Sequence, residues 1–268
     1  GRPPSAQPTP ASTVGARRTA AEMMALSEHA WRQRGEARPL LALLDNPLLL
    51  IGMGHEVPER EQLQFNYLSA MTRLLEVNAG LAGYTDRPRS RYVVGLLHLL
   101  DLEPEQVVRG ALDKDGRLEG LQDTALYRRL LYPGERSALF IQMSPLNKEF
   151  KNLAGETHEI AFFYLNTAAA GQAPKLARIE VPMWVAEDKR LVSEIQSLIY
   201  HQCQQVASRY PYVLTRAHEL ALVKHDETQQ LNVLIEVALA RSGIEAEQSE
   251  KQLGKAAVGQ RRTRFDVR

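Results

Sequence analysis

Short apolar runs of strand length alternate along this chain with longer segments of helical period. The apolar runs fall at residues 40–44, 48–51, 81–84, 137–142, 158–165 and 175–181. The helical segments fall at residues 17–31, 59–79, 92–100, 121–131, 188–207, 211–223 and 226–242. Short apolar runs bounded by turn formers are typical of buried strands, and apolar residues three or four apart are typical of helices. Strands mixed with helices along the whole chain predict an α/β or α+β protein.

The composition allows a sizeable core but excludes a disulfide framework. The 268 residues are 44% hydrophobic and 24% charged, which is ordinary for a folded protein. Cys203 is the single cysteine, in keeping with a reducing cytosol, and its apolar surroundings predict a buried helical thiol. Because no run of about 18 apolar residues occurs, no transmembrane helix is expected. We therefore expect a cytoplasmic protein without membrane contact.

The charges give no bulk case for nucleic-acid binding. The chain has 33 basic and 32 acidic residues, a net charge of +1, so any contact with DNA depends on local patches. Four arginines crowd the tail at residues 261–268, although a solvated tail explains them equally well. Residues 1–16 are rich in Pro, Ser, Thr and Gly and are expected to be flexible. The chain opens on Gly1 rather than Met, so we expect residues to be missing before it.

One carboxylate, Asp45, stands between two apolar runs, followed by Asn46 and Pro47. Asp-Asn-Pro suits a tight turn in which the Asp side chain bonds the backbone nearby. The alternative is a metal ligand at the end of a buried strand, because hard divalent cations prefer carboxylate oxygens on rigid elements. The residues alone predict strand, turn and second strand, and leave both roles of Asp45 open.

Three further side chains could carry chemistry. Glu22 lies on the first helical segment, where Arg18 can pair with it at i,i+4, and Glu28 on the same segment is a rival. His218 is either a satisfied, partly buried ring or a metal ligand or proton carrier. Tyr210 is either a core aromatic with a hydrated hydroxyl or part of a site.

Several familiar catalytic patterns are missing from the sequence. It holds no P-loop, no G-x-G-x-x-G, no H-E-x-x-H and no G-x-S-x-G. A single cysteine cannot supply the thiolate pairs of a structural zinc site. Nucleotide-binding, zinc-protease and serine-hydrolase chemistry of these kinds is therefore not indicated.

Four segments carry a resemblance to a known family. They are residues 43–49 (LLDNPLL), 82–90 (AGYTDRPRS), 162–166 (FFYLN) with 177–186 (ARIEVPMWVA), and 210–219 (YPYVLTRAHE). In this order they resemble the NurA family of DNA end-processing nucleases. The resemblance covers about residues 17–260, so we expect one nuclease domain there, between the flexible residues 1–16 and the basic tail 261–268.

The resemblance implies a fold, an activity and partners. Members of the family have an RNase H-like (Piwi-like) α/β core with a mixed central sheet flanked by helices. They are Mn²⁺-dependent nucleases, with Mg²⁺ as a possible substitute, that process DNA ends in double-strand break repair. They act as homodimers docked on a HerA-type hexameric ATPase that translocates DNA.

The resemblance also implies catalytic residues. The family's second catalytic Asp falls on Asp45, its C-terminal Tyr and His fall on Tyr210 and His218, and its helix Glu falls on Glu22 rather than Glu28. Asp45, Glu22 and His218 would then hold the metal, and Tyr210 would hold a phosphate or a metal-bound water.

Two departures from the family pattern matter. No Asp precedes Asp45, so the first catalytic Asp has no counterpart; we expect either that it lies upstream of Gly1 or that the enzyme is defective. Asn46 stands where the family usually has Gly, and Asn tolerates left-handed backbone geometry, so the turn can survive.

DNA contacts and other functions complete the set of expectations. Arg87, Arg89 and Arg216 could bind DNA phosphates; the alternative, which the residues alone favour slightly, is that they are solvated surface side chains. The alternatives to a DNA nuclease are a non-catalytic scaffold in a DNA-processing complex, a metal-dependent enzyme acting on RNA or a nucleotide, and a generic α/β binding module.

Overall fold

The computed structural model describes residues 11–50, 57, 59–100, 102–107, 116–221 and 234. The chain divides into two compact units, Gly1–Arg216 and Ala217–Arg268. The first unit contains the sheet and its helices. Of the second unit, only residues 217–221 and 234 are described, so the helix predicted over 226–242 (apart from 234) and the basic tail lie outside the described residues.

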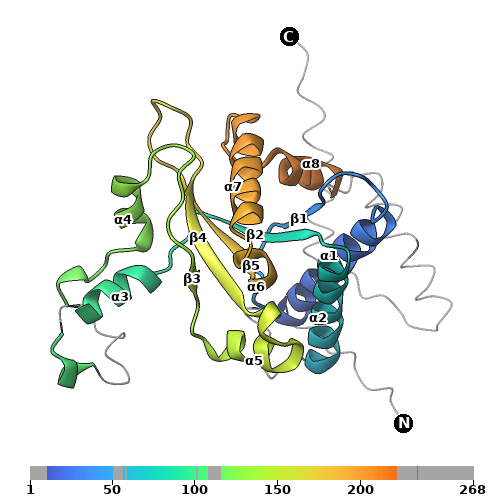
Figure 1. Ribbon diagram of the computed structural model, residues 1–268, viewed down its shortest axis with the longest axis horizontal. Coiled ribbons are helices and arrows are strands. Elements are labelled where there is room, and N and C mark those ends of the chain that lie inside the picture. The colour runs from blue at the N-terminus through green and yellow to red at the C-terminus, as the bar shows by residue number, and fades with distance from the viewer. Residues whose placement is uncertain are drawn as a thin grey trace, which may run out of the picture. The chain divides into compact units, whose positions relative to one another are not determined.

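A mixed five-stranded sheet forms the centre of the first unit. The strands are β1 (Leu41–Leu44), β2 (Gly80–Asp86), β3 (Phe140–Ile141), β4 (Ile160–Asn166) and β5 (Leu176–Pro182). Their order is β1-β2-β5-β4-β3, as Figure 1 shows from right to left. β1 and β2 are parallel and the other pairs are antiparallel. The predicted α/β class with a mixed sheet is therefore confirmed.

Helices surround this sheet. They are α1 (Ala11–Arg32), α2 (Arg60–Glu76), α3 (Tyr92–Leu100), α4 (Asp123–Leu130), α5 (Pro145–Ala154), α6 (Met183–Ala186), α7 (Lys189–Gln204) and α8 (Tyr212–Ala221). Short 3₁₀ turns lie at Pro104–Gln106, Gly116–Leu118 and Glu156–His158. Within the described residues, no helix combines the length and the apolar character that crossing a membrane requires.

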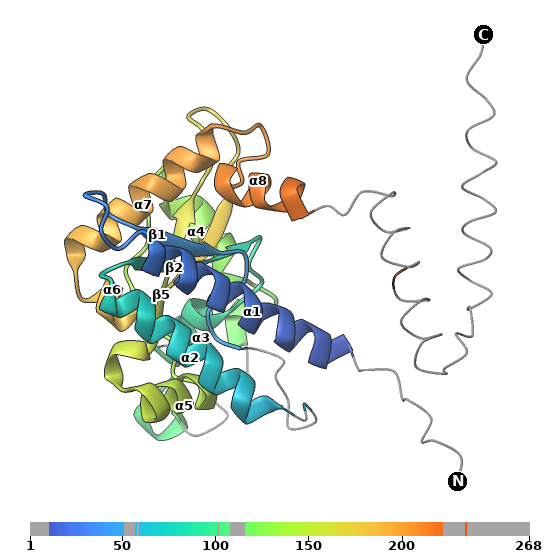
Figure 2. The ribbon, with the colours of Figure 1, turned by 90° about the vertical axis from the view of Figure 1, so that its right-hand side faces the viewer.

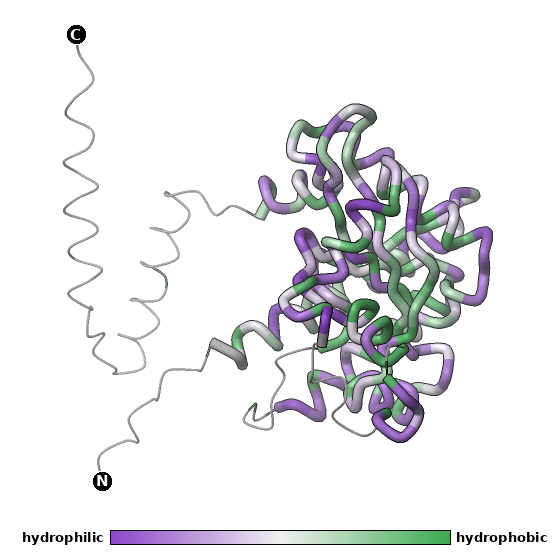
Figure 3. Tube along the Cα trace, turned by 90° about the vertical axis from the view of Figure 1, so that its left-hand side faces the viewer, coloured by the Kyte–Doolittle hydropathy of each residue, from purple (hydrophilic) through white to green (hydrophobic). Residues whose placement is uncertain are grey.

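The helices cover both faces of the sheet. α7 covers one face, where Val192, Ile195 and Ile199 pack against alternate residues of β2, β4 and β5. α1, α2 and α5 cover the β1–β2 half of the opposite face, and α3 and α4 cover its β4 side. Figure 2 shows α1 and α2 running side by side in front of the sheet. In Figure 3 the hydrophobic residues gather in the middle of the trace, and hydrophilic ones mark its outer turns.

Two helix starts show how local and distant residues share the capping of backbone N–H groups. α7 is capped locally, because the Asp188 carboxylate accepts from the N–H groups of Arg190 and Leu191. α3 is capped from a distance, because the buried Asp123 carboxylate accepts from Val94 N–H at 2.8 Å. Ser90, two residues before α3, shares a 2.7 Å hydrogen bond with the Tyr164 hydroxyl.

The structure corrects two expectations about single elements and adds a helix that was not expected. Residues 48–50 are buried but form no strand, so the second strand of the predicted strand–turn–strand is wrong there. Residues 11–16 are helical rather than flexible, because α1 begins at Ala11. α5 was not predicted; Ser144 caps its start by accepting from Asn147 N–H.

Candidate active site

Asp45 directly follows β1, at the carboxyl end of the two parallel strands. One of its carboxylate oxygens accepts a hydrogen bond from the Tyr210 hydroxyl. Tyr210 lies 165 residues further along the chain, between α7 and α8. Its ring packs edge-on against Tyr84 of β2, with the ring centroids 5.2 Å apart. The structure thus brings together two residues that the sequence assigned to one site.

The phenols of Tyr210 and Tyr84 hold their protons. Burial raises the pKa of Tyr210, and the hydrogen bond to Asp45 raises that pKa further. Burial likewise raises the pKa of Tyr84. The charge of Asp86, the last residue of β2, also raises the pKa of Tyr210. A second carboxylate therefore acts on this phenol. A neutral Tyr210 can therefore donate to the carboxylate of Asp45 and fix its orientation.

The turn after Asp45 is seated against the sheet by buried polar groups. Leu48 N–H donates to the Glu180 carboxylate at 2.7 Å, and the Tyr67 hydroxyl donates to Leu48 C=O at 2.8 Å. Glu180 lies on β5 and also accepts from the buried Arg178 at 2.6 Å. Sequence reasoning missed this pair, although two opposite charges two residues apart in an apolar strand were a usable signal.

Comparison with known proteins identifies the family. Residues 5–223 match the model of the NurA domain. The chain belongs to the NurA family. NurA is a family of nucleases that act in DNA end processing, so the resemblance found in the four sequence segments is confirmed. No curated protein and no solved structure matches the chain significantly.

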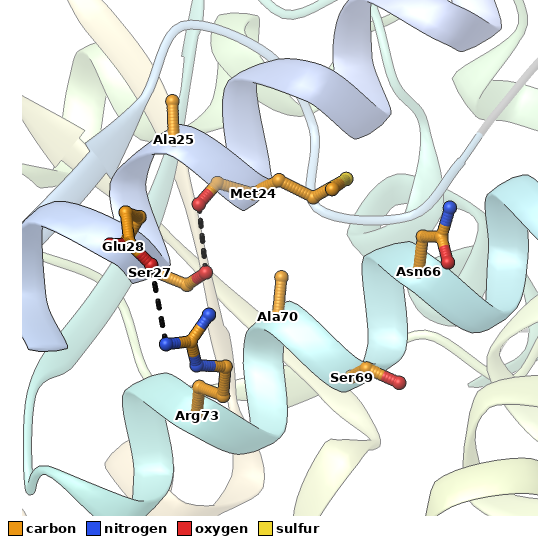
Figure 4. Close-up of a pocket in the computed structure, with 8 residues that line it drawn as sticks. All are labelled: Met24, Ala25, Ser27, Glu28, Asn66, Ser69, Ala70 and Arg73. Atoms are coloured by element: carbon orange, nitrogen blue, oxygen red, sulfur yellow. Dashed lines mark hydrogen bonds and ion pairs between the residues drawn. The ribbon is translucent and has the colours of Figure 1, made fainter.

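Both candidate helix carboxylates, Glu22 and Glu28, form ion pairs with arginines, and Glu28 forms two. It pairs with Arg32 at 3.1 Å and with Arg73 of α2 at 3.3 Å, beside a hollow between α1 and α2 (Figure 4). Glu22 pairs with Arg18 at 3.5 Å on the surface of α1. The charge of Glu22 contributes, after burial and Glu180, to the raised pKa of Tyr67.

The charge of Glu22 acts on a residue that holds the turn after Asp45. Tyr67 bonds Leu48 in the turn after Asp45, so the influence of Glu22 reaches the groups that hold this turn. A metal site shared by Glu22 and Asp45 stays a prediction.

His218 and the three arginines that were expected to bind DNA are all exposed. His218 is exposed on α8 and belongs to the second unit, so its position relative to Asp45 is not described. Arg87 and Arg89 are exposed in the segment after β2, and Arg216 is exposed on α8. Arg87 has a left-handed backbone, with φ of 49°, and its guanidinium lies 3.6 Å from the Asp86 carboxylate. Their DNA contacts stay predictions.

A complete NurA metal site would need several ligands close together. Among the described residues, no group of three or more His, Cys, Asp and Glu side chains is placed to hold a metal ion. Asp45 offers the right kind of donor, a carboxylate, but one of its oxygens accepts from Tyr210. The residues that the structure describes therefore fit only part of such a site.

Proposed function

We propose that this chain is a metal-dependent nuclease that cuts DNA at or near its ends. The observation that carries the proposal is the hydrogen bond between Asp45 and Tyr210, because it joins two segments, far apart in the sequence, that both carry the resemblance to NurA proteins. A carboxylate at the carboxyl end of parallel strands, held by a neutral phenol, is the arrangement expected of a fixed metal ligand.

The roles of the chain's own residues follow from this proposal. Asp45 supplies a carboxylate ligand for Mn²⁺, or for Mg²⁺ in its place, and Glu22 and His218 supply further ligands. When bound, such an ion would neutralise charge on a phosphate and would lower the pKa of a coordinated water. Tyr210 orients Asp45 with its hydroxyl proton. Arg87, Arg89 and Arg216 bind phosphates of the DNA backbone, which positions the strand without reading its sequence.

The finer features of the family are part of the same proposal. We infer an RNase H-like core, which the mixed sheet with helices on both faces supports. We infer a cytoplasmic homodimer that works in double-strand break repair with a HerA-type hexameric ATPase. The near-zero net charge supports this partner, because a weak basic field holds DNA poorly without a motor that feeds it in.

A non-catalytic scaffold in a DNA-processing complex is the second candidate function. The observation in its favour is that no group of three metal-binding side chains occurs among the described residues. Both candidates predict DNA as a partner, so only cleavage separates them.

The test compares the wild-type chain with Asp45→Asn on end-labelled linear DNA, with Mn²⁺ and with EDTA. Asn keeps the shape and an oxygen that accepts from Tyr210 but removes the charge. Asp188→Asn is the matched control, because Asp188 caps α7 at the surface and Asn caps equally well. We expect EDTA-sensitive shortening by the wild type and by Asp188→Asn, and none by Asp45→Asn. Absence of shortening by the wild type, with the motor partner added, supports the scaffold.

A further inference from the structure

The segment that follows Asp45 crosses the sheet in contact with the backbone of another strand. It passes over β2 at Gly83, where an added Cβ would lie 2.6 Å from the Asn46 carbonyl oxygen and 3.1 Å from Leu48 N. Only a residue without a side chain allows this approach. The turn that carries Asp45 is therefore seated directly on β2.

Leu48 fixes this turn, because both its N–H and its C=O form hydrogen bonds with buried side chains. Its N–H donates to the Glu180 carboxylate at 2.7 Å, and its C=O accepts from the Tyr67 hydroxyl at 2.8 Å. All three residues are buried. A hydrogen bond to a buried carboxylate is shorter and stronger than one between neutral groups, so Glu180 is the firmer of the two holds.

Glu180 is itself held in place. Its second oxygen accepts from Arg178 at 2.6 Å, and the Arg178 guanidinium lies 5.7 Å from the Tyr92 ring centroid and 5.9 Å from that of Phe162. The two side chains share one face of β5 and are 7% and 1% exposed. A buried ion pair adds little to stability compared with apolar residues of the same volume, so its presence points to a positioning role.

We propose that Glu180 is a positioning residue for the nuclease site: through Leu48 N–H it fixes the turn that sets the carboxylate of Asp45. This inference rests on the proposed function. Glu180 is not a catalytic residue, because it is buried and both of its oxygens accept from protein groups. It acts on the reaction only through the backbone of residues 45–48.

The geometry selects the substitution that tests this role. Glu180 faces two donors, Leu48 N–H on one oxygen and Arg178 on the other. Glu180→Gln offers one acceptor and one donor, so it sets a donor against a donor at one of the two contacts. Glu180→Asp keeps two acceptors and the charge on a shorter side chain. Glu194→Gln is the control, because it removes one carboxylate of an exposed ion pair with Arg190.

The experiment measures hydrogen exchange and cleavage kinetics on the full chain. In Glu180→Gln we expect faster exchange of the backbone amides in residues 43–50 and unchanged exchange in α7. We expect kcat to fall by about 10²-fold, the effect of a misplacement of roughly 1 Å, with KM unchanged. Glu180→Asp should recover part of kcat, and Glu194→Gln should match the wild type.

The other outcomes overturn the proposal. Unchanged exchange at residues 43–50 in folded Glu180→Gln refutes the hold on the turn, and a loss of kcat no larger than the loss of folded protein refutes the positioning role. If Glu180→Gln does not fold, Tyr67→Phe replaces it, because it releases the other end of Leu48; unchanged exchange and kcat there count against the proposal. If the wild type cuts no DNA, the proposed function fails, while exchange still decides whether Glu180 holds the turn.

Discussion

Replacing Gly83 by Ala tests how tightly the turn after Asp45 is seated on β2. The new Cβ would stand 2.6 Å from the Asn46 carbonyl oxygen, whereas ordinary contact begins at 3.4 Å, so that oxygen would have to retreat by about 0.8 Å. Overpacking of this kind lowers the free energy of unfolding by about 1–3 kcal/mol. Ala also reduces the conformational entropy of the unfolded chain, which offsets about 0.4–1 kcal/mol of that loss. We expect a net loss of about 1–2 kcal/mol, which lowers Tm by roughly 2–8 °C.

Gly80→Ala is the matched control on the same strand. Its Cβ would meet the side-chain tips of Ile195 and Leu41 at 3.3 Å and of Leu191 at 3.6 Å, which can give way. We expect its Tm to equal or slightly exceed that of the wild type. The assay is thermal unfolding followed by circular dichroism, with urea unfolding as a second measure. If Gly83→Ala is as stable as Gly80→Ala, the close seating of the turn is refuted.

The same pair of variants extends the test to activity. A retreat of about 0.8 Å in the turn would carry the carboxylate of Asp45 with it, so Gly83→Ala should lose kcat by up to about 10²-fold. Gly80→Ala should keep the wild-type kcat. Equal activity in both variants would show that Asp45 tolerates movement of the turn behind it.

Three more predictions concern single side chains. Tyr210→Phe removes the hydroxyl that bonds Asp45, a contact to a charged group worth about 1.5–3 kcal/mol, so cleavage at pH 7 should slow by about tenfold or more; an unchanged rate would separate Tyr210 from the site. Burial lowers the pKa of His158, so the unfolded chain binds this proton more readily than the folded chain. The stability that neutral His158 contributes is therefore present above about pH 6.5 and lost as the pH falls below it, at no more than about 1.4 kcal/mol per pH unit. Urea unfolding at pH 5.5 and 7.5 should show this slope, and His158→Gln should flatten it. Burial raises the pKa of the Cys203 thiol to about 11, so a thiol reagent at pH 8 should react only when urea unfolds the chain; fast reaction of the native protein would contradict the buried position.

The strands in the middle of the sheet were predictable because they are buried on both faces. β4 and β5 read as almost continuous apolar runs, and the predicted ranges agree with the observed ones within two residues. Residues 48–50 show the limit of this signal. They are just as apolar and just as buried, but the N–H and C=O of Leu48 bond the side chains of Glu180 and Tyr67 instead of a neighbouring strand. An apolar run thus predicts burial, and the partners of its backbone decide whether it is a strand.

Helix ends were less predictable where the partner is distant. Ser144, Pro145 and the left-handed Gly155 mark the ends of α5 and could have identified it from the sequence. The cap of α3 could not be found in this way, because Asp123 lies 29 residues from the N–H group that it accepts from. Local signals therefore predict the helices whose caps are local.

In the candidate site, too, the sequence predicts the local features and not the distant contacts. Asp45 and Tyr210 were assigned from their motifs, yet no spacing in the sequence predicts a hydrogen bond across 165 residues. Glu180 left a trace in the sequence, because Arg178 and Glu180 share one face of a strand that is otherwise apolar. Buried charges need partners, so this pattern predicts an ion pair in the core.

The sequence pattern of Arg178 and Glu180 does not reveal which group donates to the second carboxylate oxygen of Glu180. A carboxylate paired with one arginine still has an oxygen that needs a donor when it is buried. Here the donor is Leu48 N–H, 132 residues away, in the turn that begins at Asp45. If Leu48 N–H donated to the backbone of a neighbouring strand instead, one buried oxygen of Glu180 would lack a donor. Asp45 would then lie within a strand. The irregular turn and the buried ion pair therefore depend on each other, and the position of Asp45 depends on both.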